Sequence, residues 1–166
     1  VSRALGGRDL RIVAKSVPST SLIDYVSNLS GSNKLMAFHE PFLGAMGNPQ
    51  SDILFGKPMP VAAAARFYDR PASKRFDPTT QLQWLIDTPE RLAQYASLAQ
   101  TKNVTMRINI ELDVGLHRGG VHDPFVLQQM LNTIEQTPQL TFNGLMGYDP
   151  HVVKMPELIV GQQEEF

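Results

Sequence analysis

Lys15 is the residue of this chain with the clearest chemical use. It ends a short, largely apolar run, residues 10–14, which predicts a buried strand that runs into a turn at Pro18. Burial disfavours the charged form of an amine and so lowers its pKa. A neutral amine at the mouth of a strand could form a Schiff base with an aldehyde. The alternative is a strand-end lysine whose ammonium reaches solvent while its stem lies on apolar surface.

Two later segments place charged and aromatic groups just past a strand. Residues 110–121 run from a strand into a Gly-rich turn that carries Arg118, and residues 142–151 run from another strand to Tyr148. Arg118 could stabilise an anionic oxygen and favour a neutral Lys15 by like-charge repulsion. Its alternative role is a structural ion pair with Asp113 or Glu111. Tyr148 could stack or hydrogen-bond in a site, or could lie at a rim with its hydroxyl in water.

These three segments, in this order, resemble the fold-type III pyridoxal-phosphate enzymes, which include alanine racemase, D-threonine aldolase and eukaryotic-type D-serine dehydratase. The resemblance is strongest to the aldolase and dehydratase branch. That branch shares the strand-end lysine, an E-x-D-V-G-x-x-R-x-G-V segment at 111–121 and a G-L-x-x-Y segment at 144–148. Residues 52–58 also look like that branch. Met146 departs from the pattern, which usually has glutamine there, and methionine cannot make the hydrogen bonds of an amide.

The resemblance implies that Lys15 holds pyridoxal 5′-phosphate, with Arg118 beside the phenolate oxygen of the cofactor and Tyr148 against its ring or ring nitrogen. It implies an enzyme that acts on D-amino acids as an aldolase, dehydratase or racemase. The alternative is a non-catalytic protein of the same barrel fold that serves cofactor homeostasis. The divalent-metal ligands of this branch lie beyond Phe166, so no metal ligand is assigned here. We expect a homodimer in the complete protein.

Strands and helices alternate along the chain, which predicts βα units and a parallel sheet. We expect strands at 10–14, 35–39, 53–55, 82–87, 104–113 and 142–147. Helices are expected after Ser19 or Thr20, over 61–68, and after Thr88-Pro89 and Asp123-Pro124, where a capping residue precedes proline. Residues 70–80 are expected to form an exposed loop. This order fits part of a (β/α)₈ barrel better than a doubly wound sheet, although periodicity does not separate the two.

In a barrel, the residues that follow each strand converge on one face, where the site lies. The residues so placed are Lys15, His39, Lys57, Asp87, Arg118 and Tyr148. Lys57 is the internal rival of Lys15, but it lies between Gly56 and Pro58 in a tight turn that can point it outward. The resemblance favours Lys15, since the family lysine sits on the first barrel strand. The glycines within 115–120 predict a turn with positive φ or a close backbone approach.

Length and composition bound the remaining possibilities. The 166 residues include 15 basic and 16 acidic side chains and no cysteine. This balance gives no electrostatic basis for binding nucleic acid or an anionic membrane, and no apolar run reaches the roughly 20 residues of a membrane-spanning helix. Cytoplasm is therefore the default expectation. A (β/α)₈ barrel needs about 250 residues, so we expect 1–166 to be an incomplete cofactor-binding barrel domain. Its last strands, the phosphate loop after a seventh strand and a C-terminal β-rich domain would lie elsewhere.

Overall fold

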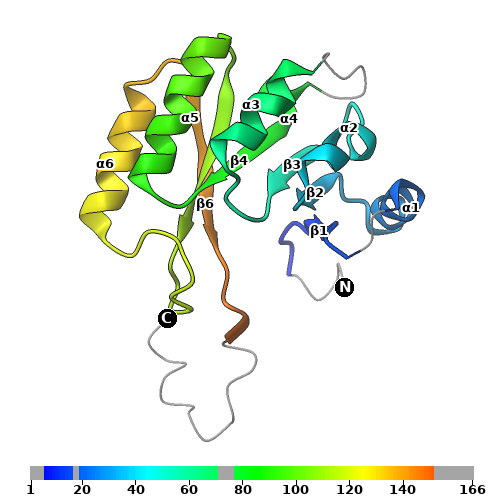
Figure 1. The fold of residues 1–166 in the computed structure, drawn as a ribbon. Coiled ribbons are helices and arrows are strands. Elements are labelled where there is room, and N and C mark those ends of the chain that lie inside the picture. Colours follow the sequence, from blue (N-terminus) through cyan, green and yellow to red (C-terminus); the bar gives the residue numbers. More distant parts are fainter. Residues whose placement is uncertain (1–5, 17–18, 71–76, 152–166) are drawn as a thin grey trace, which may run out of the picture.

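The computed structural model describes residues 6–16, 19–70 and 77–151, which form one sheet with flanking helices (Figure 1). The turn expected at Pro18 lies outside these ranges. The strands are β1 (Ile12–Val13), β2 (Lys34–Ala37), β3 (Asp52–Phe55), β4 (Leu82–Ile86), β5 (Met106–Leu112) and β6 (Leu140–Gly147). The helices are α1 (Thr20–Ser30), the 3₁₀ helix η2 (Glu40–Phe42), α2 (Leu43–Met46), α3 (Val61–Asp69), α4 (Pro78–Gln81), α5 (Pro89–Lys102) and α6 (Pro124–Glu135).

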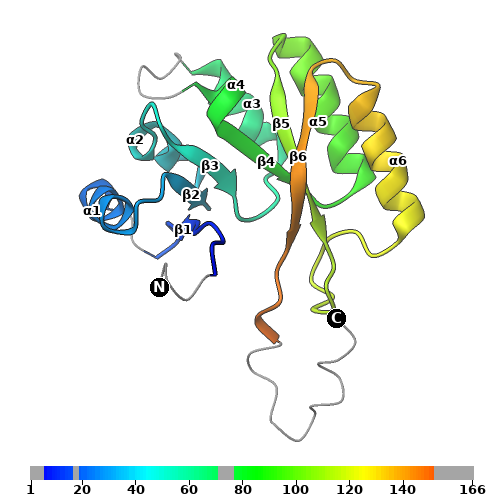
Figure 2. The same cartoon turned by 180° about the vertical axis from the view of Figure 1, so that it is seen from behind.

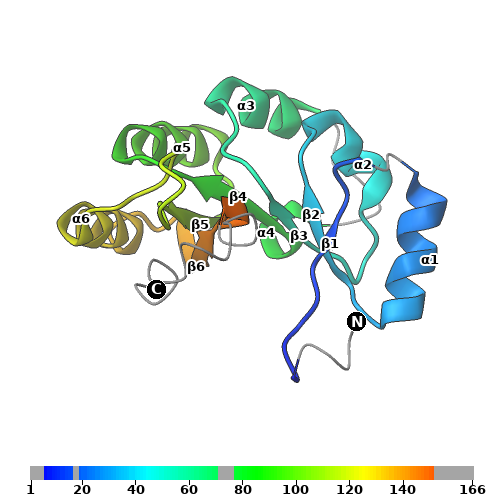
Figure 3. The ribbon, with the colours of Figure 1, turned by 90° about the horizontal axis from the view of Figure 1, so that it is seen from below.

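The sheet has the strand order of a barrel. Its six strands follow one another in sequence order, and every neighbouring pair is parallel. Helices α1, α3, α5 and α6 form an arc on one face of the sheet (Figure 3), and the view from behind shows the other face (Figure 2). A doubly wound sheet reverses its strand order and carries helices on both faces. The expectation of part of a (β/α)₈ barrel is therefore confirmed.

The helix starts follow the capping signals of the sequence. The hydroxyl of Thr88 accepts a hydrogen bond from the backbone N–H of Arg91 at 3.1 Å, and the carboxylate of Asp123 accepts one from Phe125 at 2.8 Å. Proline follows each cap at the first helical position, where its missing N–H costs nothing. Both predicted helix starts are confirmed.

The expected loop at 70–80 contains a short helix. Asp77 caps α4 by accepting a hydrogen bond from the backbone N–H of Thr79 at 2.9 Å, with Pro78 at the first helical position. This is the same cap-then-proline signal that begins α5 and α6, so the loop prediction was wrong for 78–80. The short helices at 40–46 were also not predicted.

Trp84 defines which face of the sheet meets the helices. It is fully buried, its ring stacks on Phe55 at 4.8 Å between centroids, and it packs against Tyr95 of α5. Its indole N–H donates to the hydroxyl of Tyr68 on α3 at 3.0 Å. Because side chains alternate along a strand, Gln83 points to the opposite side, which we call the inner face. Residues that pair across neighbouring strands lie on the same face of the sheet. Their pairing with β4 therefore shows which residues of the other strands point to the inner face.

Candidate functional site

The carboxyl ends of the parallel strands form the candidate site. The arrowheads of β5 and β6 point downward in Figure 1, and because every neighbouring pair of strands is parallel, the carboxyl ends of the other strands lie at the same edge of the sheet. The residues predicted to converge follow the ends of β1 to β6 in turn: Lys15, His39, Lys57, Asp87, Arg118 and Tyr148. These six residues lie on one side of the molecule because they share an edge of the sheet. The contacts of each side chain show which of them could act together.

Lys15 lies on the inner face beyond β1. Val13 pairs with Met36, and Arg11 reaches the inner-facing carboxylate of Asp52, so alternate residues of this strand point inward. The Nζ of Lys15 stands 5.3 Å from the centroid of the Phe38 ring, and the side chain is exposed. The amine is therefore accessible from the inner face.

Phe38 occupies its place only because residue 56 is glycine. A Cβ on Gly56 would lie 2.2 Å from Cζ of Phe38 and 2.7 Å from Cγ of Met36, distances too short for any real contact. The phenyl ring beside Lys15 thus lies directly over the end of β3. Phe38 was not predicted as a site residue, and Gly56 was considered only as a neighbour of Lys57. A glycine directly after a buried strand was the available signal for a close approach.

Arg118 is held between two groups at the ends of β5 and β6. One guanidinium nitrogen donates to Oε1 of Glu111 at 3.2 Å. The carbon of the same guanidinium lies 4.5 Å from the centroid of the Tyr148 ring, a distance at which a cation is attracted to the ring face. The structural ion pair, one of the two alternatives for Arg118, is therefore present, and it fixes the charge against Tyr148.

Glu111 is the acidic residue of this site that sequence reasoning considered only as a possible ion-pair partner. Its side chain is 4% exposed. Burial raises the pKa of its carboxyl group, the hydrogen bond and charge of Arg118 oppose that rise, and the charges of Asp87 and Asp113 add to it. Asp87 itself binds Nε of Arg91 at 2.6 Å. A buried carboxylate that faces one cation orients that cation firmly.

The turn after β5 is shaped by its aspartate and glycines. Asp113 accepts hydrogen bonds from the backbone N–H groups of Gly115 and His117, and Nδ1 of His117 lies 2.9 Å from Oδ2 of Asp113. The side-chain bond to His117 is the main cause of a lowered pKa at Asp113. Gly120 has φ +99°, and a Cβ there would meet the backbone N of Asp113 at 2.7 Å. The glycine prediction is confirmed at Gly115 and Gly120, whereas Gly119 has open space around it.

His39 and Lys57 follow their strands but point into solvent. His39 precedes η2 and makes no side-chain cap there. Lys57 is exposed in the bend after β3. Across the described ranges 6–16, 19–70 and 77–151, no group of three His, Asp or Glu residues could hold a metal ion. The prediction that any metal binds outside this segment stays a prediction.

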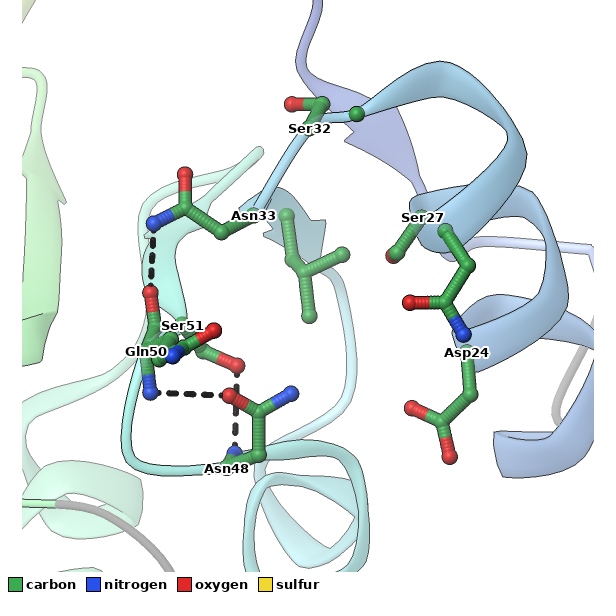
Figure 4. Close-up of a pocket in the computed structure, with 10 residues that line it drawn as sticks. Asp24, Ser27, Ser32, Asn33, Asn48, Gln50 and Ser51 are labelled. Carbon is green, nitrogen blue, oxygen red and sulfur yellow. Dashed lines mark hydrogen bonds between the residues drawn. The ribbon is translucent and has the colours of Figure 1, made fainter.

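A pocket lies at the opposite edge of the sheet, beside α1 and the loops that precede β2 and β3 (Figure 4). Its polar groups largely bond to one another: Asn33 donates to the carbonyl of Gln50 at 2.6 Å, and the backbone N–H of Asn48 donates to Oγ of Ser51 at 3.1 Å. These bonds shape the turn before β3. The pocket is remote from Lys15 and Arg118, and we do not assign the site to it.

Comparison with known proteins identifies the type of domain. The family model "Alanine racemase, N-terminal domain" matches residues 62–166, more than half of the chain. No curated protein matches this sequence. None of the α-helices in the described segments is long and apolar enough to cross a membrane.

Solved structures with the same fold include D-threonine aldolase from Filomicrobium marinum, which aligns with a TM-score of 0.69 and 17% identity over 91% of this chain and 39% of that chain. A point mutant of D-threo-3-hydroxyaspartate dehydratase aligns with a TM-score of 0.75 and 17% identity over 98% of this chain and 41% of its own. Alanine racemase from Oenococcus oeni gives 0.73 and 13%, over 98% and 45% respectively. This chain thus spans about two fifths of the length of these structures, and the likeness concerns the fold.

Proposed function

The chain belongs to the family of alanine racemase N-terminal domains, the barrel of the fold-type III pyridoxal-phosphate enzymes, and from that premise we propose that it is the cofactor-binding part of an enzyme acting on D-amino acids. The observation that carries this proposal is the position of Arg118 between Glu111 and Tyr148, at the same edge of the sheet as Lys15. That edge holds an accessible amine, an anchored cation and an aromatic ring.

These groups fit the aldehyde end of pyridoxal phosphate. An aldehyde requires a primary amine, which Lys15 offers on the inner face. A phenolate oxygen requires a fixed positive charge, and the carboxylate of Glu111 fixes that of Arg118. A flat ring requires apolar or aromatic surface, which Tyr148 and Phe38 supply.

Each residue then has a separate task. Pyridoxal phosphate, when bound, supplies a ring that accepts the electrons of a bond breaking at the substrate. Lys15 would hold the cofactor through Nζ, and Nζ, when free, would act as a base and carry the proton it removes from the substrate. Arg118 would stabilise the phenolate oxygen. Tyr148 would offer the ring a neutral partner, and the ring would then be a weaker electron sink than with a carboxylate partner.

The reaction type is the finer part of the proposal. The segments 111–121 and 144–148 support lyase chemistry, as in a D-threonine aldolase or D-serine dehydratase, over racemisation. The fold is shared with an aldolase, a dehydratase and racemases alike. We further propose that the complete protein is a homodimer and that any divalent metal binds outside residues 1–166.

An assay of the complete protein on D-threonine, D-serine and D-alanine, with and without divalent metal, tests the function. Glycine plus acetaldehyde indicates aldol cleavage, pyruvate from D-serine indicates dehydration, and L-alanine indicates racemisation. Cofactor bonded at Lys15 with no turnover of any D-amino acid would contradict the proposal and favour the non-catalytic carrier.

A further inference from the structure

Strand β6 contains one extra residue. Ile108 of β5 pairs with Phe142, but the next residue of β5, Asn109, pairs with Gly144, so Asn143 is left over as a β-bulge. A bulge adds one residue to one strand only, and it changes the face on which all following side chains lie. Bulges are frequent beside active sites, where they redirect a side chain.

The bulge determines where Tyr148 points. After it, Gly144 pairs with the inner-facing Asn109, so even-numbered residues of this segment face inward. Counting in twos from Gly144 reaches Tyr148, on the side where Arg118 lies. If β6 continued in regular register past Phe142, Asn143 would pair with Asn109, the odd-numbered residues would face inward, and the ring of Tyr148 would turn toward the helix side of the sheet.

Polar side chains of two neighbouring strands hold the bulge in place. The side-chain amide of Asn143 donates to Oε1 of Gln83 at 2.8 Å, and Nε of Arg107 donates to Oδ1 of Asn143 at 3.1 Å. Gln83 is only 1% exposed, and its Oε1 also accepts from the amide of Asn109 at 2.9 Å. Buried polar groups are costly to leave unpaired, so these bonds favour a bulge at this residue over its neighbours.

The same group of side chains reaches the strand that carries Lys15. The amide nitrogen of Gln83 donates to the carboxylate of Asp52, which in turn accepts from Arg11 of the β1 segment. Arg11 also donates to the backbone carbonyls of Leu35 at 3.0 Å and Asp52 at 2.9 Å. A continuous set of hydrogen bonds therefore links the two edge strands of the sheet, on the amino side of the candidate site.

We propose that Asn143 is a positioning residue for Tyr148: the bulge it forms, held by Gln83 and Arg107, aims the Tyr148 ring at Arg118. The proposal rests on the proposed role of Tyr148 beside the cofactor. Asn143 lies toward the amino end of the sheet and acts through the strand rather than on the substrate.

A crystal structure of the cofactor-free complete protein with Asn143→Val tests the geometry without reference to catalysis. Valine cannot make the bonds to Gln83 and Arg107, and its β-branched side chain favours regular pairing of residue 143 with Asn109. We expect the Tyr148 ring to leave the Arg118 guanidinium, from which it stands 4.5 Å away in the intact chain. The matched control is Thr141→Ala, a change ahead of the bulge on the same strand, which should leave the contact intact. A Tyr148 ring still seated on Arg118 in Asn143→Val would overturn the proposal.

A double-mutant cycle provides a second test should the Asn143→Val variant not fold. Asn143→Ala and Tyr148→Ala should each weaken binding of pyridoxal phosphate roughly fivefold, the size expected for loss of an aromatic contact with a cation. The double variant should bind no more weakly than Tyr148→Ala alone, since one residue acts through the other. Additive losses would contradict the proposal. If the wild-type protein binds no cofactor, the proposed function fails, and the cofactor-free structure of Asn143→Ala decides the positioning role on its own.

Discussion

Glu111 and Arg118 form a buried-to-surface ion pair in which one partner fixes the other. The carboxylate is almost fully enclosed, whereas about half of the arginine side chain remains exposed, and one hydrogen bond of 3.2 Å joins them. A long exposed arginine would ordinarily sample many rotamers. Anchored at one end and covered by the Tyr148 ring, this one presents its charge in a fixed direction at the edge where Lys15 emerges.

Replacing Glu111 with glutamine should weaken cofactor binding without unfolding the protein. Gln is nearly isosteric, and a neutral amide is cheaper to bury than a carboxylate, so we expect the free energy of unfolding to change by less than about 1 kcal/mol. Arg118 loses a charged anchor, and affinity for pyridoxal phosphate should fall roughly tenfold. Urea unfolding and cofactor titration measure the two quantities. Unchanged affinity would show that Arg118 needs no anchor.

The titration of Glu111 should respond to its partner. Its pKa in the folded protein lies above the ordinary value of 4.5, so the folded state holds this proton more tightly than the unfolded chain does. The resulting contribution to stability is complete below pH 4.5 and is lost as pH rises through the raised pKa.

Removing Arg118 takes away an interaction that lowers this pKa, so in Arg118→Met we expect Glu111 to titrate at higher pH than in the wild type. Carbon-13 NMR of the Glu111 carboxyl group measures the shift directly. A midpoint that stays in place or moves to lower pH in the variant would be inconsistent with the ion pair.

Gly56→Ala should lower the stability of the protein and its affinity for the cofactor more than an ordinary glycine-to-alanine change does. The added methyl group would meet Phe38 at 2.2 Å, so the ring beside Lys15 must move. Overpacking of this kind costs about 1–3 kcal/mol, and we expect a drop in both melting temperature and cofactor affinity. Gly44→Ala is the matched control, since no atom lies within 4 Å of its added Cβ. Equal behaviour of the two variants would contradict the role given to Phe38.

The alternation of strands and helices could be predicted from sequence because both signals are local. The strands around Trp84 and Ile108 are apolar runs, and Thr88 and Asp123 carry cap-then-proline signals that begin their helices. The start of β6 was placed two residues late, at Phe142 instead of Leu140. The ends of strands depend on pairing with neighbours, which local sequence does not encode.

The contacts of the site were less accessible to prediction. Arg118 and Tyr148 were named as separate candidates, but their meeting depends on the bulge at Asn143, a property of the register between two strands. The position of the Phe38 ring depends on the absence of a Cβ at Gly56, at the end of the neighbouring strand. Both contacts depend on which residues of neighbouring strands lie opposite each other. A single sequence does not specify that register.

Identification of the lysine that bonds to the cofactor tests the central proposal most directly. The complete protein is incubated with pyridoxal phosphate, reduced with borohydride and mapped by peptide mass spectrometry, with Lys15→Ala and Lys57→Ala as matched variants. We expect the label on Lys15, its loss in Lys15→Ala and its retention in Lys57→Ala. A label on Lys57, or one that survives in Lys15→Ala, would contradict the assignment of the site.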